Sequence, residues 1–265
     1  MTNNLPFQMI ATDLDRTLLL DDETLSVATI EAIRRAKGNG FLFVVATARS
    51  LYSTMLVARD LCPDAVIHTG GAYAVVGDQV IYRAVLSPED TVEAALTCLS
   101  SPFVHHIRIC GETEDITTNP AIPVGQKEFL HYRRVSDEEL PKAALQAATK
   151  VTICSPEPDK VAALFDGDPR YLFTPSKNTS RFGHKLAHPS ATKEAALAHV
   201  AAHFGITCDE IVAFGDDMAD LGMLSMCGLG VAVANAVPEI KAVADAVCGS
   251  NEEDGVAHYI NEFFL

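Results

Sequence analysis

Apolar and polar residues alternate along the first part of the chain as expected for buried strands separated by amphipathic helices. Each apolar run is four to six residues long, which suits a strand that is buried on both faces. The stretches between these runs carry apolar residues at helical spacing. The pattern predicts strands at residues 7–12, 41–46 and 65–68, helices at 27–37 and 50–61, and a hairpin at 75–81 that turns at Gly77-Asp78.

The same alternation returns in the last third of the chain. It predicts strands at 211–214 and 230–233 and helices at 192–204, 221–226 and 254–264. Strands that are separated by helices pair in parallel, and the helices then cover both faces of the sheet. We therefore expect an α/β fold whose core is a doubly wound parallel sheet of the Rossmann-like type.

The middle of the chain, residues 85–186, has a different pattern. Its predicted strands are more polar, and its prolines cluster at the ends of elements. This stretch is expected to be an α+β domain inserted into a core formed by residues 1–84 and 187–265. The predicted strands of the insertion are 104–110, 129–135 and 151–154, and its predicted helices are 88–99 and 138–148.

Composition and charge narrow the range of partners. The chain has 265 residues, and 20 Lys and Arg against 35 Asp and Glu give a formal net charge of −15. A chain this acidic is poorly suited to nucleic acid or to anionic membranes, since both require clustered basic residues. No apolar run is long enough to span a membrane, and the start of the chain lacks the pattern of a signal peptide. Seven scattered cysteines without a C-x-x-C pair are expected to be reduced thiols of a cytoplasmic protein. The oligomeric state is left open.

Two carboxylates one residue apart follow the first predicted strand. Asp13 and Asp15 are therefore candidate site residues, because ligands of open parallel sheets bind beyond the carboxyl ends of the strands. Turn-forming aspartates are the alternative explanation. A calcium loop is excluded, since Leu18 stands at the position of its glycine and Thr24 at that of its bidentate glutamate.

A second acidic cluster follows the strand predicted at 211–214. Asp216 and Asp220 are four residues apart, so a helix starting here would present both on one side, whereas Asp217 is explained as a helix cap. Two acidic clusters at the ends of strands in one sheet repel each other unless a cation neutralises them. Ligands that are all oxygen atoms, and few in number, favour Mg²⁺.

Two further features fit a phosphate group. Thr47 offers a hydroxyl where the strand at 41–46 gives way to a helix, together with free backbone N–H groups. Lys193 stands at the start of the helix predicted at 192–204, where it can act as a point charge on phosphate oxygens. A solvated helix lysine is the alternative explanation for Lys193.

Taken in order, these motifs resemble those of the haloacid dehalogenase-like hydrolases. The position of the insertion resembles the Cof-type branch of that superfamily, which carries a type-two (IIB) cap. The tail segments at 230–236 and 251–257 look like the same branch. The motifs are Asp13-x-Asp15-x-Thr17, then Thr47, then Lys193, then Gly215-Asp216-x-x-x-Asp220.

The resemblance implies a Mg²⁺-dependent phosphatase of small phosphorylated metabolites, sugar phosphates above all, whose cap selects the substrate. It implies that Asp13 is the nucleophile that takes the phosphoryl group. It implies that Asp15 protonates the leaving alkoxide and then activates water. The implied metal ligands are Asp13, the backbone carbonyl of Asp15 and Asp216, with Asp220 in support. The implied phosphate-binding residues are Leu14, Thr47, Ala48 and Lys193.

Three positions depart from the family pattern. Arg16 stands where the family usually has Gly, Gly70 stands at the Asn position of an Asn-Gly-Ala pattern, and Ala219 replaces the Asn before Asp220. Two other functions stay open beside the phosphatase: a phosphosugar mutase of the same superfamily, and a non-catalytic phosphate-binding or regulatory protein. A D-x-D metal-dependent glycosyltransferase is disfavoured, because it does not call for the set of Thr47, Lys193 and Asp220. The departures at Arg16 and Ala219 favour the non-catalytic alternative.

Paired basic residues and histidines outside these motifs are interpreted as surface groups. His199 and His203 lie opposite the apolar face of the helix predicted at 192–204. Strand neighbours face opposite ways, so at most one member of a pair in the insertion can meet a substrate. The pairs are His105-His106 and Arg133-Arg134.

Overall fold

The computed structural model describes residues 6–122, 124, 132–176 and 183–264. The chain folds into two compact units, each packed mainly against itself. One unit joins Met1–Arg83 to Thr192–Leu265, and the other is the uninterrupted segment Ala84–Ala191. We call them the core and the cap.

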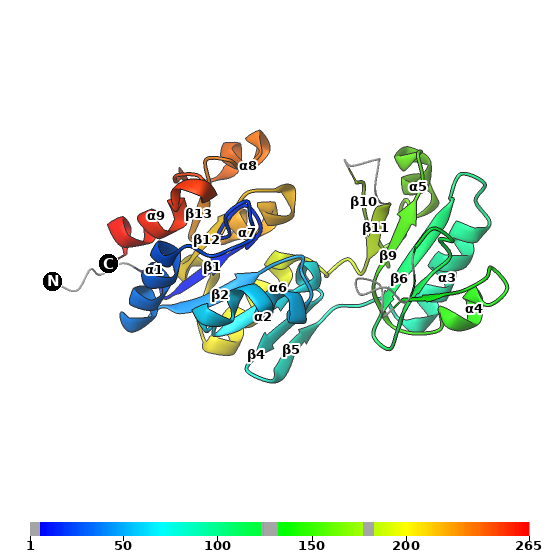
Figure 1. The fold of residues 1–265 in the computed structure, drawn as a ribbon, viewed down its shortest axis with the longest axis horizontal. Coiled ribbons are helices and arrows are strands. Elements are labelled where there is room, and N and C mark those ends of the chain that lie inside the picture. The colour runs from blue at the N-terminus through cyan, green and yellow to red at the C-terminus, as the bar shows by residue number, and fades with distance from the viewer. Residues whose placement is uncertain (1–5, 123, 125–131, 177–182, 265) are drawn as a thin grey trace. The chain divides into compact units, whose positions relative to one another are not determined.

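The core is built on a mixed, mostly parallel sheet with the strand order β14-β13-β12-β1-β2-β3-β4-β5. Strands β1, β2, β4, β5, β12 and β13 of this sheet are labelled in Figure 1. Neighbours from β14 to β3 are parallel, and the hairpin β4–β5 continues the sheet in antiparallel fashion. The expected α/β fold is confirmed. The strands are β1 (Met9–Thr12), β2 (Leu42–Ala46), β3 (Ala65–His68), β4 (Tyr73–Val76), β5 (Gln79–Arg83), β12 (Ile211–Gly215), β13 (Leu229–Ala232) and β14 (Ala246–Val247).

Strand β1 lies where the strand order of the sheet changes direction. The next strands along the chain, β2 and β3, extend the sheet on one side of β1, and β12, β13 and β14 extend it on the other. Thr12 of β1 pairs with Val45 of β2 on one side and with Phe214 of β12 on the other. All four residues of β1 are buried, which explains its continuous apolar run. The carboxyl ends of three strands therefore meet at one edge, where ligands of such sheets bind.

Helices cover both faces of the core sheet. The right-handed crossover rule puts the helices after β1 and β2 on one face and those after β12 and β13 on the other. In agreement, α7 and α8, which follow β12 and β13, pack against each other. In addition, α1 packs against α9, and α6 packs against α7. The helices are α1 (Val27–Gly38), α2 (Leu51–Ala58), α6 (Lys193–Phe204), α7 (Leu221–Met226), α8 (Pro238–Val243) and α9 (Gly255–Phe263).

The cap has its own sheet, with the strand order β10-β11-β9-β6-β7-β8. All neighbours are antiparallel except β7 and β8. Apolar residues of the sheet, such as Ile109 and Val151, form a buried cluster with Ala94 of α3 and Val161 of α5. The elements are α3 (Pro88–Leu99), β6 (His106–Gly111), β7 (Asp115–Thr117), β8 (Tyr132–Arg134), α4 (Leu140–Ala143), β9 (Ala148–Cys154), α5 (Pro158–Leu164), β10 (Leu172–Thr174) and β11 (His184–Ala187).

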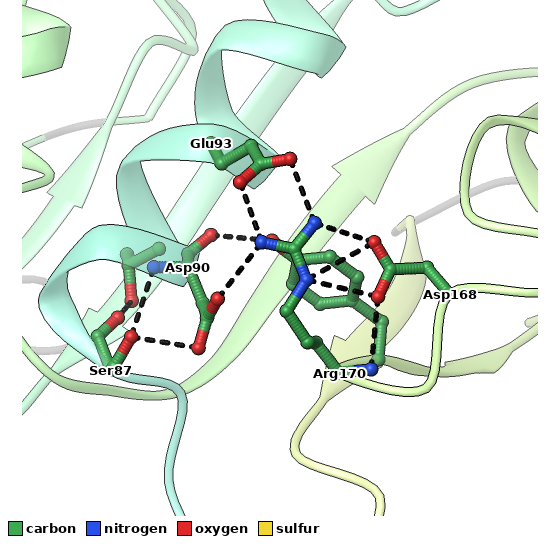
Figure 2. A network of polar contacts seen from close by, with 7 residues as sticks. Ser87, Asp90, Glu93, Asp168 and Arg170 are labelled. Atoms are coloured by element: carbon green, nitrogen blue, oxygen red, sulfur yellow. Dashed lines mark hydrogen bonds and ion pairs between the residues drawn. The ribbon is translucent and has the colours of Figure 1, made fainter.

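A network of charged groups ties the first two turns of α3 to the segment before β10 (Figure 2). The Arg170 guanidinium contacts Glu93 and Asp168 at 2.6 Å each and Asp90 at 3.2 Å. The Asp90 backbone N–H donates in turn to the Ser87 hydroxyl at the start of the helix. Because one guanidinium is shared by three carboxylates, this part of the cap is held by a network rather than by isolated pairs.

The helix predicted at 138–148 is wrong for most of its length. Only α4 forms there, and Ala148 already belongs to β9. The buried side chain of Gln146 accepts hydrogen bonds from the Thr113 hydroxyl and from the backbone of Thr113 and Glu114. These tertiary contacts outweigh the helix propensity of the alanine-rich segment.

Two limits predicted from the sequence stay predictions. The domain limit placed between residues 186 and 187 falls inside β11, and the division of the chain into compact units lies between Ala191 and Thr192. Residues 125–131 lie outside the described part, so only Tyr132–Arg134 of the strand predicted at 129–135 is observed. Within the described ranges, no helix is long and apolar enough to cross a membrane.

Candidate active site

Asp13 lies one residue beyond β1, at the edge where the three strands end. Its backbone N–H donates to the Phe214 carbonyl over 3.0 Å, which continues the β1–β12 ladder. The residue is only 6% exposed. The sheet therefore fixes the backbone of Asp13, while its carboxylate is held in a buried position.

Lys193, the first residue of α6, bridges two buried carboxylates. Its Nζ lies 2.5 Å from Asp13 Oδ1 and 2.6 Å from Asp220 Oδ1, and its side chain is 3% exposed. Thr192 caps the helix by accepting the Ala195 N–H. The alternative of a solvated helix lysine is wrong.

Gly71 allows the start of α6 to reach this position. Its φ is +93°, and a Cβ there would lie 2.2 Å from the carbonyl carbon of Thr192 and 2.7 Å from the nitrogen of Lys193. Both distances are far below van der Waals contact. The close approach of two backbones therefore requires glycine.

The loop after β12 holds the other two carboxylates. Asp220 Oδ2 accepts the backbone N–H groups of Asp216 and Asp217, each over 3.1 Å. The Thr17 hydroxyl donates to Asp216 Oδ1 over 3.2 Å. The other oxygen of Asp220 contacts Lys193, so both oxygens of Asp220 have partners. Asp220 thus fixes the loop after β12 through hydrogen bonds to the backbone of that loop.

Burial raises the pKa of two of these carboxyl groups. The pKa of Asp13 rises to about 7 through burial, reinforced by the charges of Asp220 and Asp216 and opposed by Lys193. The pKa of Asp216 rises to about 6 through burial and the charge of Asp220. Burial would lower the pKa of Lys193, but the contacts with Asp13 and Asp220 raise it, so its ammonium stays charged.

The cluster has the chemistry of a divalent cation site. Oxygen atoms of Asp13, Asp216 and Asp220 all lie within 4.8 Å of one another. Three carboxylates beside one ammonium leave an excess of two negative charges when all are ionised. Oxygen ligands at an acidic site suit Mg²⁺. Since both oxygens of Asp220 already have partners, Asp13 and Asp216 would hold the ion and Asp220 would support them.

The stabilisation of the protein by Mg²⁺ is expected to increase as the pH rises from about 5 to about 8. The pKa values of Asp13 and Asp216 lie above 3.8, so the folded state binds these protons more tightly than the unfolded chain. Without metal, these groups therefore reduce stability as the pH rises through about 6 and about 7. Mg²⁺ binds the deprotonated groups and cancels the loss. Thermal unfolding with and without Mg²⁺ across this range measures the effect, and a shift independent of pH would contradict it.

Asp15 lies apart from the buried cluster and pairs with Arg49. Arg49 Nε contacts both Asp15 oxygens, at 3.1 and 2.9 Å, and its Nη2 contacts Asp15 as well. Arg49 also binds Glu23 over 3.0 Å. Arg49 follows Thr47 and Ala48, so this ion pair joins the loop after β1 to the loop after β2.

The turn at Thr47 presents polar groups at the same edge of the sheet. The Thr47 hydroxyl accepts the Arg49 N–H over 3.2 Å, which leaves the hydroxyl proton for another acceptor. Within the described ranges, no acceptor takes the backbone N–H of Leu14 or of Ala48. Open N–H groups beside a hydroxyl suit an anion.

The departure at Arg16 preserves the geometry that glycine favours. Arg16 has a φ of +60°, in the left-handed region. Asn235 Nδ2 donates to its carbonyl over 2.7 Å and helps to hold the turn. Gly70 likewise has a positive φ, of +71°, and Ala219 is exposed.

Three contributors were not assigned a role from the sequence. Arg49 stands in the quoted Thr47 motif, and Thr17 stands in the quoted Asp13 motif, but which carboxylate each contacts depends on distant parts of the chain. For Gly71 the sequence shows only the pair Gly70-Gly71, which does not indicate a close approach of two backbones.

His199 and His203 are exposed as expected. In the cap, Arg133 binds Glu114 over 2.7 Å, and Arg134 donates to the Ile122 carbonyl.

Comparisons with known proteins agree with this architecture. A sequence profile of the haloacid dehalogenase-like hydrolases matches residues 10–260. A stress response protein of Bacillus subtilis (strain 168) is 27% identical over 277 residues, covering 97% of this chain and 93% of that protein. A 5-amino-6-(5-phospho-D-ribitylamino)uracil phosphatase of the same organism is 26% identical over 278 residues, with 97% of each covered. The solved structure of a subclass IIB sugar phosphatase gives a TM-score of 0.76 at 26% identity, covering 97% of this chain and 98% of that one. The chain belongs to the haloacid dehalogenase-like hydrolases.

Proposed function

We propose that this hydrolase is a Mg²⁺-dependent phosphatase of small phosphorylated metabolites that acts through a phosphoryl group carried on Asp13. The observation that carries the proposal is the buried contact of 2.5 Å between Asp13 and Lys193. An attacking carboxylate and a phosphate repel each other, and the ammonium offsets that repulsion. When bound, Mg²⁺ would supply further charge neutralisation at the phosphoryl oxygens.

The reaction divides into two displacements. An oxygen of Asp13 forms a bond to phosphorus as the bond to the leaving alkoxide breaks, and Asp15 gives the alkoxide a proton. Asp15 then takes a proton from water as that water attacks the phosphorus of the aspartyl phosphate and releases Asp13. The covalent intermediate replaces one difficult step with two easier ones.

The remaining residues hold the groups that react. Arg49 orients the Asp15 carboxylate through its two-atom contact. The Thr47 hydroxyl and the backbone N–H groups of Leu14 and Ala48 would bind phosphoryl oxygens, in company with Lys193.

The core motifs contain little that could recognise the rest of a substrate. We assign that task to the cap and favour sugar phosphates, in keeping with the sugar phosphatase among the similar structures. A phosphosugar mutase with the same core would return the phosphoryl group to the substrate instead of to water. Arg16 has a positive φ, a conformation that glycine also adopts readily, so the departure from glycine is not by itself an argument for the non-catalytic alternative.

Release of inorganic phosphate from a panel of sugar phosphates tests the proposal. We expect turnover with Mg²⁺, none in EDTA, and much lower rates with Ca²⁺. Mg²⁺ imposes a tight octahedral geometry, whereas Ca²⁺ takes more ligands at longer distances and misaligns Asp13 with phosphorus. Full activity in EDTA, or equal rates with the two metals, would contradict the site. Isomerised esters without phosphate release would indicate a mutase.

A further inference from the structure

Two asparagine side chains from the C-terminal part of the core contact the loop after β1. They stand in the two tail segments that resemble the Cof-type branch, and the proposed function assigns them no role. Asn235 Nδ2 donates to the Arg16 carbonyl over 2.7 Å, and Asn251 Nδ2 donates to the Leu19 carbonyl over 3.0 Å. Two backbone positions of the loop after β1 are therefore held by residues that lie far away in the sequence.

The two asparagines are also joined to each other. The Asn251 backbone N–H donates to Asn235 Oδ1 over 3.0 Å. Asn235 therefore uses both ends of its amide, since the oxygen accepts from Asn251 and the nitrogen donates to Arg16. A flipped amide would place two donors or two acceptors against each other, so these partners fix the orientation of Asn235. Asn251 is only 4% exposed and anchors the arrangement in the interior.

The loop after β13, residues 233–237, also contacts the loop after β12. The Val237 N–H donates to the Asp216 carbonyl over 2.9 Å. Asn235 of the same short loop donates to the Arg16 carbonyl. One loop therefore binds both acidic loops of the candidate site, the loop after β12 through Val237 and the loop after β1 through Asn235.

The backbone groups that the loop after β13 holds lie beside the proposed metal ligands. Asp216 is one of these ligands, and Arg16 directly follows Asp15, whose backbone carbonyl is a further ligand that the family resemblance implies. Arg16 has a φ of +60°, and this left-handed conformation is unfavourable for a residue with a Cβ. The hydrogen bond from Asn235 offsets that preference. Loss of this bond would free the peptide beside Asp15 to move relative to Asp216.

We propose that Asn235 is a positioning residue for the metal site. It fixes the peptide that follows Asp15 relative to Asp216, and thereby sets the spacing of the oxygen atoms that would hold Mg²⁺. Mg²⁺ demands a near-ideal octahedral geometry, whereas Ca²⁺ accepts longer and more variable distances. Loss of the Asn235 contact should therefore weaken Mg²⁺ binding more than Ca²⁺ binding. The inference rests on the proposed phosphatase function, and it adds a residue that acts through the proposed metal ligands.

The test measures the Mg²⁺ and Ca²⁺ dissociation constants of the full-length Asn235→Ala protein by calorimetry, without substrate. Loss of a group that orients metal ligands typically weakens metal binding by about 10- to 100-fold. We expect the dissociation constant for Mg²⁺ to rise about tenfold and that for Ca²⁺ to rise clearly less. The ratio of the two constants is the decisive quantity, because a general loss of stability would change both constants alike.

A second variant keeps the test valid if Asn235→Ala does not fold, which thermal unfolding without metal would show. In Asn235→Asp the carboxylate can still accept from the Asn251 N–H, but the donor to the Arg16 carbonyl is lost. The added negative charge strengthens the binding of both divalent cations. The preference for Mg²⁺ over Ca²⁺ should therefore still fall.

The matched control is Asn39→Ala. Asn39 Nδ2 donates to the Arg35 carbonyl over 3.1 Å at the end of α1, before β2 begins and so at the edge of the sheet opposite the acidic loops. The substitution removes a hydrogen bond of the same kind and should leave both metal constants as in the wild type. An unchanged Mg²⁺ constant in the Asn235 variants, an equal loss for the two cations, or the same loss in Asn39→Ala would overturn the positioning role.

Metal binding separates failure of this inference from failure of the phosphatase function. If the wild type binds Mg²⁺ but releases phosphate from no ester, the phosphatase proposal fails, and the ratio of the metal constants still decides the role of Asn235. If the wild type hydrolyses p-nitrophenyl phosphate with Mg²⁺ and the ratio is unchanged in the variants, only the positioning role fails. If the wild type binds no Mg²⁺, both proposals fail.

Discussion

Replacing Asp13 with Asn is expected to abolish turnover while the protein remains folded. The amide keeps the shape of the side chain but lacks the charge and the nucleophilic oxygen, so kcat should fall by a factor of about 10³ or more. Folding should survive because burial already raises the pKa of Asp13 to about 7, and a neutral group relieves repulsion from Asp216 and Asp220. Phosphate release and thermal unfolding of the same preparation measure the two effects.

The control for this substitution is Asp78→Asn, which makes the same chemical change in the exposed turn between β4 and β5. It should leave both rate and stability unchanged. Wild-type turnover by a folded Asp13→Asn protein would remove Asp13 from its role as nucleophile.

Replacing Lys193 with Met should reduce both stability and activity. The ammonium lies between Asp13 and Asp220, so its loss leaves two buried carboxylates without their cationic partner. Breaking a buried pair in this way costs about 3–5 kcal/mol of unfolding free energy. Loss of a charge at the transferring phosphoryl group should lower kcat by about 10²-fold or more.

Denaturant unfolding at neutral pH measures the stability of the Lys193→Met protein. Lys241→Met, on the exposed surface of α8, is the matched control and should behave as the wild type. Mg²⁺ should stabilise the Lys193→Met protein more than the wild type. In the variant the ammonium that offsets the charges of Asp13 and Asp220 is missing, so the metal neutralises more uncompensated charge. A stability equal to that of the wild type would mean that the bridge contributes nothing to folding.

The sequence predicted several elements with their observed bounds because local signals agreed with the fold. Strand β3 and helices α3 and α7 were expected where they occur. Helix α3 illustrates why. Ser87 caps the helix and Pro88 is its first residue, so two adjacent residues of the sequence indicate where the helix begins. The helix predicted at 138–148 failed because Gln146 is fixed by contacts with Thr113 and Glu114, which no local pattern contains.

In the candidate site, too, features set by local sequence could be predicted and features set by contacts between distant segments could not. Asp13 and Asp216 could be placed from sequence, since each follows a buried strand whose carboxyl end defines the binding edge. The family assignment from ordered motifs is confirmed. The pairing of Asp15 with Arg49 could not be foreseen, because it joins two loops whose separation in space depends on how β1 and β2 pair. The chemical roles of these residues remain predictions that the substitutions above test.

The division of the core into two chain segments has a consequence for the order of folding during synthesis. Strand β1 pairs with β2 early, but its other neighbour, β12, follows only after the whole cap, with Met9 paired to Ile211. The cap is one continuous segment, and domains generally fold as units as they emerge from the ribosome. The cap can therefore complete its fold while β1 still has an open, apolar edge. Unpaired edges of this kind promote aggregation, so the interval between the emergence of β1 and that of β12 is when the nascent chain most needs protection.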